Sequence, residues 1–171
     1  MLFRSTLDIP AMISALESGE IIGVAKGRAE FGPRALGNRS LLADPRGPDA
    51  KDRVNAVKKR EPFRPFAPVI LEEYAKEYFG NVRHDQSYMQ YTNECLYPEQ
   101  YPAICHMDGT SRIQTVGNDG SMIRQILEAW NERTGCPMLL NTSLNVKGEP
   151  LVNTWADAVR SEEHTSELQS H

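Results

Sequence analysis

The sequence predicts a single α/β domain. Short apolar runs at residues 21–25, 67–71 and 138–140 have the length of buried strands, and the segments between them carry apolar residues at helical spacing. The chain has 171 residues, 40% hydrophobic and 25% charged, which is ordinary for a soluble globular domain with a real core. No apolar run approaches the length of a membrane-spanning helix.

The first half of the chain alternates helices and strands. Asp8 and Pro10 are typical of a helix start, and apolar residues recur at helical spacing as far as about Ser18. Residues 21–25 then predict a short strand that runs into a glycine-rich loop. The elements predicted next are a strand, a helix, a strand and a helix over residues 40–43, 48–59, 67–71 and 72–79.

The second half is less regular until residue 112. Residues 80–109 predict a loop-rich excursion with at most one strand, because polar residues and tyrosines interrupt the pattern. Residues 112–116 alternate as a strand should, and either Asp119 or Ser121 caps a helix that reaches Arg133. The later elements predicted are a turn, a buried strand and a final helix capped by Thr154, over residues 135–137, 138–140 and 155–159.

Positive charge is concentrated in one segment of a mildly acidic chain. The formal net charge is −4, yet residues 26–64 contain eleven Lys and Arg against five Asp and Glu. This asymmetry predicts a local anion site rather than a nucleic-acid surface, for which a basic domain overall is expected. Part of the excess is a solvated helix face, to which we assign Lys51, Arg53 and, in the preferred register, Lys58.

The three cysteines predict no metal site. Cys95, Cys105 and Cys136 are odd in number and lack the spacing of zinc ligands or of a redox pair. We therefore expect reduced, mostly buried thiols in a cytoplasmic protein.

The segment GRAEFGPRALGNRS, residues 27–40, has the composition of an anion-binding loop. Its glycines let backbone N–H groups approach a ligand, its proline fixes the bend, and arginine forks match phosphate oxygens. Arg34 and Arg39 are five residues apart, so the loop itself must bring them to one ligand. We expect Arg34, Arg39 and the hydroxyl of Ser40 to bind phosphate groups.

Two other charged residues of this loop have more than one interpretation. Arg28 is equally compatible with ligand binding and with an ordinary surface position. Glu30 either orients an arginine through a salt bridge or contacts a ligand hydroxyl or metal, and we favour the structural role.

A second basic turn follows the predicted helix, in the sequence KREPFRPF at residues 59–66. Prolines on both sides of Phe63 and Arg64 reduce the entropy lost when Arg64 meets a ligand. Lys59 and Arg64 are therefore the second predicted pair of phosphate binders, with Lys58 in place of Lys59 if the register differs. The aromatic side chains of this turn are interpreted as core anchors.

Small polar side chains follow the buried strand at residues 138–140. Asn141, Ser143 and Asn145 would lie at its carboxyl end, where they can orient ligand oxygens, although a plain Asx turn is the alternative. His106 and Asp108 form a His-x-Asp pair, which is too weak a pattern to predict metal ligation.

Four sequence blocks resemble the C-terminal domain of the O-carbamoyltransferases, the family of nodulation-factor and antibiotic carbamoyltransferases. They are GRAEFGPRALGNRSLLADPR at 27–46, RVNAVKKREPFRPFAP at 53–68, HMDGTSRIQTV at 106–116 and PMLLNTSLNVKGEPLV at 137–152. The resemblance implies a YrdC-like fold, a twisted mixed sheet with helices on its faces. Where the family commonly has phenylalanine, this chain has Leu144, which should alter packing more than chemistry.

The resemblance also implies a reaction. Carbamoyl phosphate and ATP, with Mg²⁺ on the nucleotide, would react in this domain to give carbamoyl-adenylate and pyrophosphate. The carbamoyl group would then pass to a substrate hydroxyl in an N-terminal actin-like domain, which holds the family's metal and is absent from this chain. The residues expected to act in catalysis are Arg34, Lys59 and Ser143; those expected to bind substrate or ATP phosphates are Arg28, Arg39, Ser40, Arg64, Asn141 and Asn145.

The resemblance places His106, Asp108 and Arg112 near the interface with that N-terminal domain. Two alternatives remain: a threonylcarbamoyl-adenylate synthase-like domain for tRNA modification, which would share the fold, and a non-catalytic RNA-binding module. The amino-acid sequences of residues 30–37 and of the block that begins at His106 favour the O-carbamoyltransferase pattern. We expect no membrane or nucleic-acid partner.

Both ends of the chain resemble translated sequencing adapters. We interpret residues 1–5 and 160–171 as non-native and residues 6–159 as a C-terminally truncated domain. Truncation would be expected to leave part of the core uncovered, around residues 138–140 and Val152, and so to make the fragment unstable.

Overall fold

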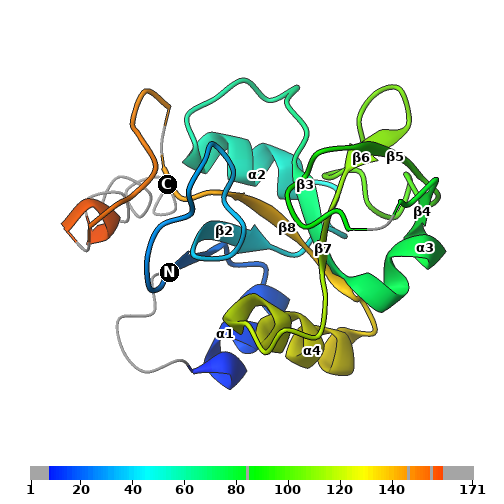
Figure 1. Ribbon diagram of the computed structural model, residues 1–171. Coiled ribbons are helices and arrows are strands. Elements are labelled where there is room, and N and C mark those ends of the chain that lie inside the picture. Colours follow the sequence, from blue (N-terminus) through cyan, green and yellow to red (C-terminus); the bar gives the residue numbers. More distant parts are fainter. Residues whose placement is uncertain (1–7, 84, 146, 155, 160–171) are drawn as a thin grey trace.

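The computed structural model describes residues 8–83, 85–145, 147–154 and 156–159. In these ranges a five-stranded mixed sheet is covered by helices on both faces, and a small three-stranded sheet lies to one side (Figure 1). Residues 1–5 and 160–171, which we interpreted as non-native, and Trp155 lie outside the described residues. Within the described ranges, no helix combines the length and apolarity needed to cross a membrane.

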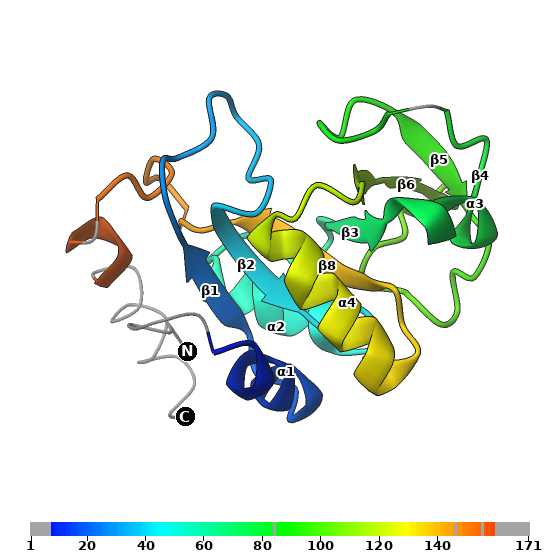
Figure 2. The same ribbon diagram turned by 60° about the horizontal axis from the view of Figure 1, so that its bottom comes forward.

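The larger sheet has a central strand from late in the chain. Its strands, in spatial order, are β1 (Ile22–Ala25), β2 (Arg39–Ala43), β8 (Met138–Ser143), β3 (Ala67–Leu71) and β7 (Gln114–Val116). The helices are α1 (Ile9–Glu17), α2 (Ala50–Val57), α3 (Ala75–Tyr78) and α4 (Met122–Thr134), with a 3₁₀ turn η1 (Glu72–Tyr74) before α3. Helices α1 and α4 cover one face and α2 the other (Figures 1 and 2).

The register brings three loops to one edge of the larger sheet. Strand β8 runs antiparallel to both neighbours, with Ser143 opposite Ser40 and Asn141 opposite Ala67. The carboxyl end of β8 therefore lies beside the amino ends of β2 and β3. The glycine-rich loop enters β2 at this edge, and the basic turn enters β3.

Side-chain caps mark the starts of α1 and α4. Asp8 Oδ1 accepts a 3.0 Å hydrogen bond from the backbone N–H of Ala11, and Ser121 Oγ accepts one of 3.3 Å from that of Arg124. Ser121, not Asp119, is thus the cap of α4. Gly135 ends this helix in the left-handed conformation, with φ of 72°.

The core lies between the larger sheet and its helices. Leu16 of α1 and Ile126, Leu127 and Trp130 of α4 are completely buried, and these two helices pack on each other. The expectation that residues 138–140 and Val152 would be left uncovered is wrong: residues 138–140 are fully buried and Val152 is 4% exposed. Residues 138–140 are covered because β8 is the central strand, so neighbouring strands and helices on both faces enclose it. Val152 lies after this strand, and its backbone N–H donates to the carbonyl of Leu144 at 3.2 Å, which holds it against the end of β8.

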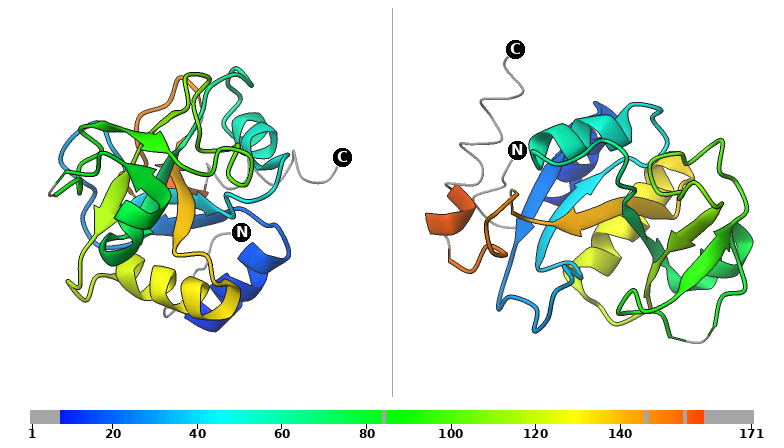
Figure 3. Two further views of the ribbon diagram at one scale, coloured as in Figure 1. Left: turned by 90° about the vertical axis from the view of Figure 1, so that its right-hand side faces the viewer. Right: turned by 90° about the horizontal axis from the view of Figure 1, so that it is seen from above.

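The small sheet was not predicted. Its antiparallel strands are β4 (Phe79–Gly80), β5 (Thr92–Cys95) and β6 (Thr110–Arg112), and it lies beside β3 and β7 (Figures 2 and 3). The strand predicted over residues 112–116 is divided at the buried Ile113, because β6 pairs with β5 whereas β7 pairs with β3. Short, polar strands such as β5 carry too weak an alternation to be separated from loops.

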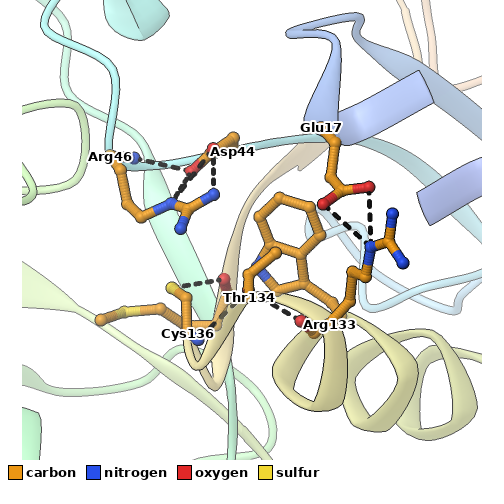
Figure 4. A network of polar contacts seen from close by, with 8 residues as sticks. Glu17, Asp44, Arg46, Arg133, Thr134 and Cys136 are labelled. Atoms are coloured by element: carbon orange, nitrogen blue, oxygen red, sulfur yellow. Dashed lines mark hydrogen bonds and ion pairs between the residues drawn. The ribbon is translucent and has the colours of Figure 1, made fainter. Parts of the chain in front are cut away.

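A polar network fixes the turn between α4 and β8 (Figure 4). Arg133 Nε donates to both carboxylate oxygens of Glu17 at 3.1 Å. Thr134 Oγ1 donates to the carbonyl of Trp130 at 2.7 Å and accepts from the N–H of Cys136 at 3.2 Å. These contacts set where the chain enters β8 and thus support the strand that carries the site.

Candidate anion-binding site

A cavity of about 340 Å³ opens at the carboxyl end of β8. Four arginines line it, Arg34, Arg60, Arg64 and Arg112, together with the imidazole of His106, and its lining residues include no Asp or Glu. Asn141, Thr142 and Ser143 of β8 form a polar wall beside them. Several arginines in one concave site whose lining contains no carboxylate favour a multiply charged anion.

Arg60 is held in place by its neighbours. Its guanidinium lies 4.2 Å from the centroid of the Phe66 ring, and its Nε donates a 2.6 Å hydrogen bond to Asn55 Oδ1. Burial lowers the pKa of Arg60, and the charge of Arg64 acts in the same direction. Arginine nevertheless remains cationic at neutral pH. Arg60 was missed in the sequence, although it continues the KKR run that drew attention to Lys59.

Asn55 also shapes the basic turn. Its Nδ2 donates to the carbonyls of Pro62 and Arg64 at 3.2 and 3.0 Å. Arg64 Nε lies 3.0 Å from Glu61 Oε2. The turn that presents Arg60 and Arg64 is therefore organised by a buried amide on α2, as well as by the prolines that the sequence indicated.

Lys58, not Lys59, joins the polar residues that follow β8. Lys58 is 5% exposed, and its Nζ donates to the carbonyl and hydroxyl oxygens of Ser143 and to the carbonyl and Oδ1 of Asn145. Lys59 is exposed, has a left-handed φ of 51° and does not line the cavity. Lys59 was expected at the site, but the residue found there is Lys58, one position earlier. The difference arises because α2 ends at Val57 and the chain reverses there.

The Lys58 environment is unusual for a lysine. Burial, together with the smaller effect of the nearby Arg60 charge, lowers its pKa to about 7. Ser143 Oγ also donates a 2.6 Å hydrogen bond to Asn145 Oδ1. Asn145 is thus part of a network with Lys58 and Ser143, of which Ser143 lines the cavity.

Arg39 is placed differently from the expectation that it binds phosphate. It is 7% exposed, and its Nε donates to the carbonyl of Val152 at 3.0 Å. Its Nη1 donates to the carbonyls of Lys26 and Asn38 at 2.9 and 2.8 Å, and its Nη2 to that of Gly27 at 2.9 Å. These main-chain acceptors occupy its donors, so Arg39 closes the base of the glycine-rich loop instead of lining the cavity.

Ser40 and Glu30 likewise support the loop. Ser40 is fully buried, and its Oγ accepts from the N–H of Gly37 at 3.0 Å. Glu30 Oε1 accepts from the backbone N–H groups of Leu36 at 2.8 Å and Asn38 at 2.6 Å. Glu30 therefore has a structural contact, but with main-chain amides rather than with an arginine.

The other predicted site residues are divided. Arg28 and Arg34 are both exposed, and of the two only Arg34 lines the cavity. His106 and Arg112 also line it. Asp108 does not: it is exposed, and its Oδ1 accepts from the N–H and Oγ1 of Thr110 at 3.0 and 2.7 Å, which fixes a turn.

Asn141 is anchored on the sheet by a second amide that the sequence did not indicate. Its Nδ2 donates to the carbonyl of Ala35 at 3.0 Å and to Gln114 Oε1 at 2.8 Å. Gln114 Nε2 donates in turn to the carbonyl of Leu36 at 3.0 Å. The available signal for Gln114 was a polar residue inside an otherwise buried strand. The pair connects β8, β7 and the glycine-rich loop.

Residues 13–169 match the family model described as carbamoyltransferase C-terminus. The chain belongs to this carbamoyltransferase family. It is 48% identical over 150 residues to nodulation protein NolNO of Sinorhizobium fredii, covering 84% of this chain and 22% of the relative. It is 39% identical over 154 residues to 3'-hydroxymethylcephem-O-carbamoyltransferase of Amycolatopsis lactamdurans, covering 90% of this chain and 29% of the relative.

The carbamoyltransferase C-terminal domain has a YrdC-like fold. Full-length HypF, crystallised in a phosphate- and nucleotide-bound form, superposes with a TM-score of 0.66 at 16% identity over 95% of this chain and 20% of its own. The H234A/Y235A form of P. abyssi Sua5 superposes with a TM-score of 0.64 at 12% identity, covering 96% of this chain and 51% of its own. The chain spans less than a third of the length of the two curated relatives.

Proposed function

We propose that the domain binds carbamoyl phosphate and ATP in the arginine-lined cavity and forms carbamoyl-adenylate, from which a substrate hydroxyl receives the carbamoyl group. One observation carries the proposal: four arginines line a single cavity without any acidic lining residue. Both substrates are multiply charged phosphates, so charge neutralisation and positioning are the main catalytic requirements.

The chemistry balances in three steps. Water cleaves carbamoyl phosphate into carbamate and inorganic phosphate, with release of a proton. A carbamate oxygen then attacks the α-phosphorus of ATP; the new P–O bond forms as the bond to pyrophosphate breaks. In the later transfer, the acceptor oxygen bonds to the carbamoyl carbon, AMP leaves and the hydroxyl proton is released.

The described residues have distinct tasks in this scheme. Arg34, Arg60 and Arg64 lie on two loops that meet over the polar wall of β8, where they would neutralise phosphate charge. Ser143 would orient a ligand oxygen, with Lys58 holding the end of β8 through its bonds to Ser143 and Asn145. Each cation is attached to a structured turn, so little reorganisation is needed on binding.

Mg²⁺ would enter with the nucleotide. In the described ranges, no group of three or more His, Cys, Asp or Glu side chains is arranged to hold a metal ion. The cavity offers arginines and amides instead of carboxylates, so the phosphates of ATP would supply the ligands for the ion. Its contribution would be to neutralise phosphate charge.

The substrate that carries the acceptor hydroxyl would be bound by another part of a longer protein. The relative from A. lactamdurans is named for carbamoyl transfer to 3'-hydroxymethylcephem, and it extends well beyond the length matched here. We place the contact with an N-terminal actin-like domain near His106, Asp108 and Arg112. The exposed side chain of Met107 in the same turn adds apolar surface to this candidate interface.

The test is pyrophosphate release by the full chain. With ATP and carbamoyl phosphate together, we expect release above the rate with either substrate alone, and we expect loss of that release in Arg60→Ala. Threonine with bicarbonate serves as the alternative acyl source. Release that depends on threonine and not on carbamoyl phosphate would favour a threonylcarbamoyl-adenylate synthase. A chain that binds neither carbamoyl phosphate nor ATP in calorimetry would refute the proposal.

A further inference from the structure

The orientation of the Asn141 carboxamide is fixed by two main-chain carbonyls. The carbonyl of Ala35 can only accept, so the Asn141 atom at 3.0 Å from it must be the amide nitrogen. The carbonyl of Leu36 fixes Gln114 in the same way, which leaves Gln114 Oε1 as the acceptor for Asn141 Nδ2. A flipped Asn141 amide would place its oxygen against two acceptors.

This orientation leaves Asn141 Oδ1 without a hydrogen-bond partner among the described residues. The residue is 1% exposed, so solvent reaches it poorly. Buried amide oxygens are almost always paired, and an unpaired one in a native fold requires an explanation. A ligand donor in the cavity is one explanation, because Asn141 lines that cavity.

Asn93 shows what distinguishes Asn141. Asn93 is also buried, donates from Nδ2 to the carbonyls of Gly80 and Asn81 at 3.3 and 3.0 Å, and has an unpartnered Oδ1. It lies on β5 of the small sheet and outside the cavity lining. Among the residues that the structure describes, Asn141 alone combines an unpaired buried oxygen with a place in the wall of the arginine-lined cavity.

We infer that Asn141 Oδ1 accepts a hydrogen bond from the carbamoyl NH₂ of the substrate and thereby selects carbamoyl over acyl groups that lack this donor. The inference rests on the proposed function. At neutral pH the NH₂ is the only hydrogen-bond donor of carbamoyl phosphate, because its phosphate and carbonyl oxygens accept. Acetyl phosphate replaces that NH₂ by a methyl group of similar size and would leave Oδ1 unpaired.

The experiment compares the dissociation constants of carbamoyl phosphate and acetyl phosphate, measured by calorimetry on the full chain. We expect the unsubstituted chain to prefer carbamoyl phosphate by at least about tenfold, because the analogue leaves a buried acceptor unpaired. Asn141→Leu should reduce the preference to within about threefold, with acetyl phosphate affinity retained. Asn93→Leu is the matched control: it removes a similar buried amide and should keep the preference.

Acetyl phosphate binding also reports whether the variant site is intact. If Asn141→Leu binds neither compound, Gln114→Met decides, since it leaves Asn141 in place but removes one of its two anchors; its preference should fall several-fold. The inference is overturned if either variant still binds acetyl phosphate and keeps the full preference for carbamoyl phosphate. It is also overturned if the substitution weakens only the binding of ATP. If the unsubstituted chain binds neither acyl phosphate, the proposed function fails first and the inference fails with it.

Discussion

Arg39 of β2 and Val152, 113 residues further along the chain, are joined by a 3.0 Å hydrogen bond from Nε to the carbonyl oxygen. The same guanidinium binds the carbonyls of Lys26 and Gly27 at the start of the glycine-rich loop. One buried side chain therefore ties both ends of that loop to the segment that follows β8.

Arg39→Ala should destabilise the fold. The buried carbonyl of Val152 and the partly buried carbonyls of Lys26, Gly27 and Asn38 lose their donor at once. Because an unpaired buried group costs about 1–3 kcal/mol, a loss of roughly 3 kcal/mol in unfolding free energy is expected. Urea unfolding measures it. Arg133→Ala is the control, because it removes an arginine whose ion pair with Glu17 is on the surface and worth at most about 1 kcal/mol. Equal unfolding free energies of the two variants would contradict the conclusion that Arg39 stabilises the fold by holding the ends of the glycine-rich loop.

Arg34→Ala should have the opposite profile. Arg34 lines the cavity and is exposed, so its removal should change the unfolding free energy by less than about 0.5 kcal/mol. Carbamoyl-phosphate-dependent pyrophosphate release should fall by roughly 100-fold, the effect of losing one charged donor to a developing anion. Pyrophosphate release at a near-parental rate would show that Arg34 does not contact the reacting ligand.

Lys58 should make stability depend on pH. Its folded-state pKa of about 7 lies below the 10.5 of an unperturbed lysine, so between these values the unfolded chain binds more protons than the folded one. Unfolding free energy should therefore rise with pH across this window, by up to about 1.4 kcal/mol per unit from this group. Below pH 7 both states are protonated and the slope from Lys58 disappears.

The measurement is urea unfolding at pH 7, 8 and 9 for the unsubstituted chain, Lys58→Met and Lys59→Met. Lys58→Met should lose the rising component. Lys59→Met should keep it, because that neighbour is exposed. Parallel pH profiles for all three proteins would show that the folded chain keeps Lys58 fully charged over this range.

Glu30 should be replaceable by glutamine but not by alanine. Its Oε1 accepts from the N–H groups of Leu36 and Asn38, and a glutamine oxygen can do the same without bringing negative charge to an anion site. Glu30→Gln should bind carbamoyl phosphate within about threefold of the parent, whereas Glu30→Ala should weaken binding by about tenfold or more because the loop loses its internal acceptor. Calorimetry compares them; similar affinities would show that the loop keeps its form without the carboxylate.

Much of the larger sheet could be predicted from the sequence. Residues 67–71 form a strand with the predicted limits, and β1 and β2 end at the predicted residues and start within one residue of the expectation. These strands are apolar and buried, so their local pattern is strong. The small sheet was missed because β4, β5 and β6 are two to four residues long and largely polar, and their pairing depends on distant partners.

The site was predicted in its chemistry more than in its individual contacts. The basic loops identify the region of the site. Composition cannot distinguish an arginine that lines a cavity, such as Arg34, from one whose N–H groups all donate to main-chain carbonyls, such as Arg39. That difference depends on residues 152–153, far along the chain. The one-residue displacement from Lys59 to Lys58 follows from the helix end at Val57, and helix ends are seldom fixed by pattern alone.

The central position of β8 also bears on the order of folding. This strand separates β2 from β3, although both are made about seventy to a hundred residues earlier. During synthesis, the two earlier strands cannot complete their pairing until residues 138–143 have emerged from the ribosome. The sheet therefore closes late, through contacts of high sequence separation, which makes folding slower than in a domain of local contacts. Until β8 inserts, the nascent chain carries the basic loops without the wall that would select their ligand.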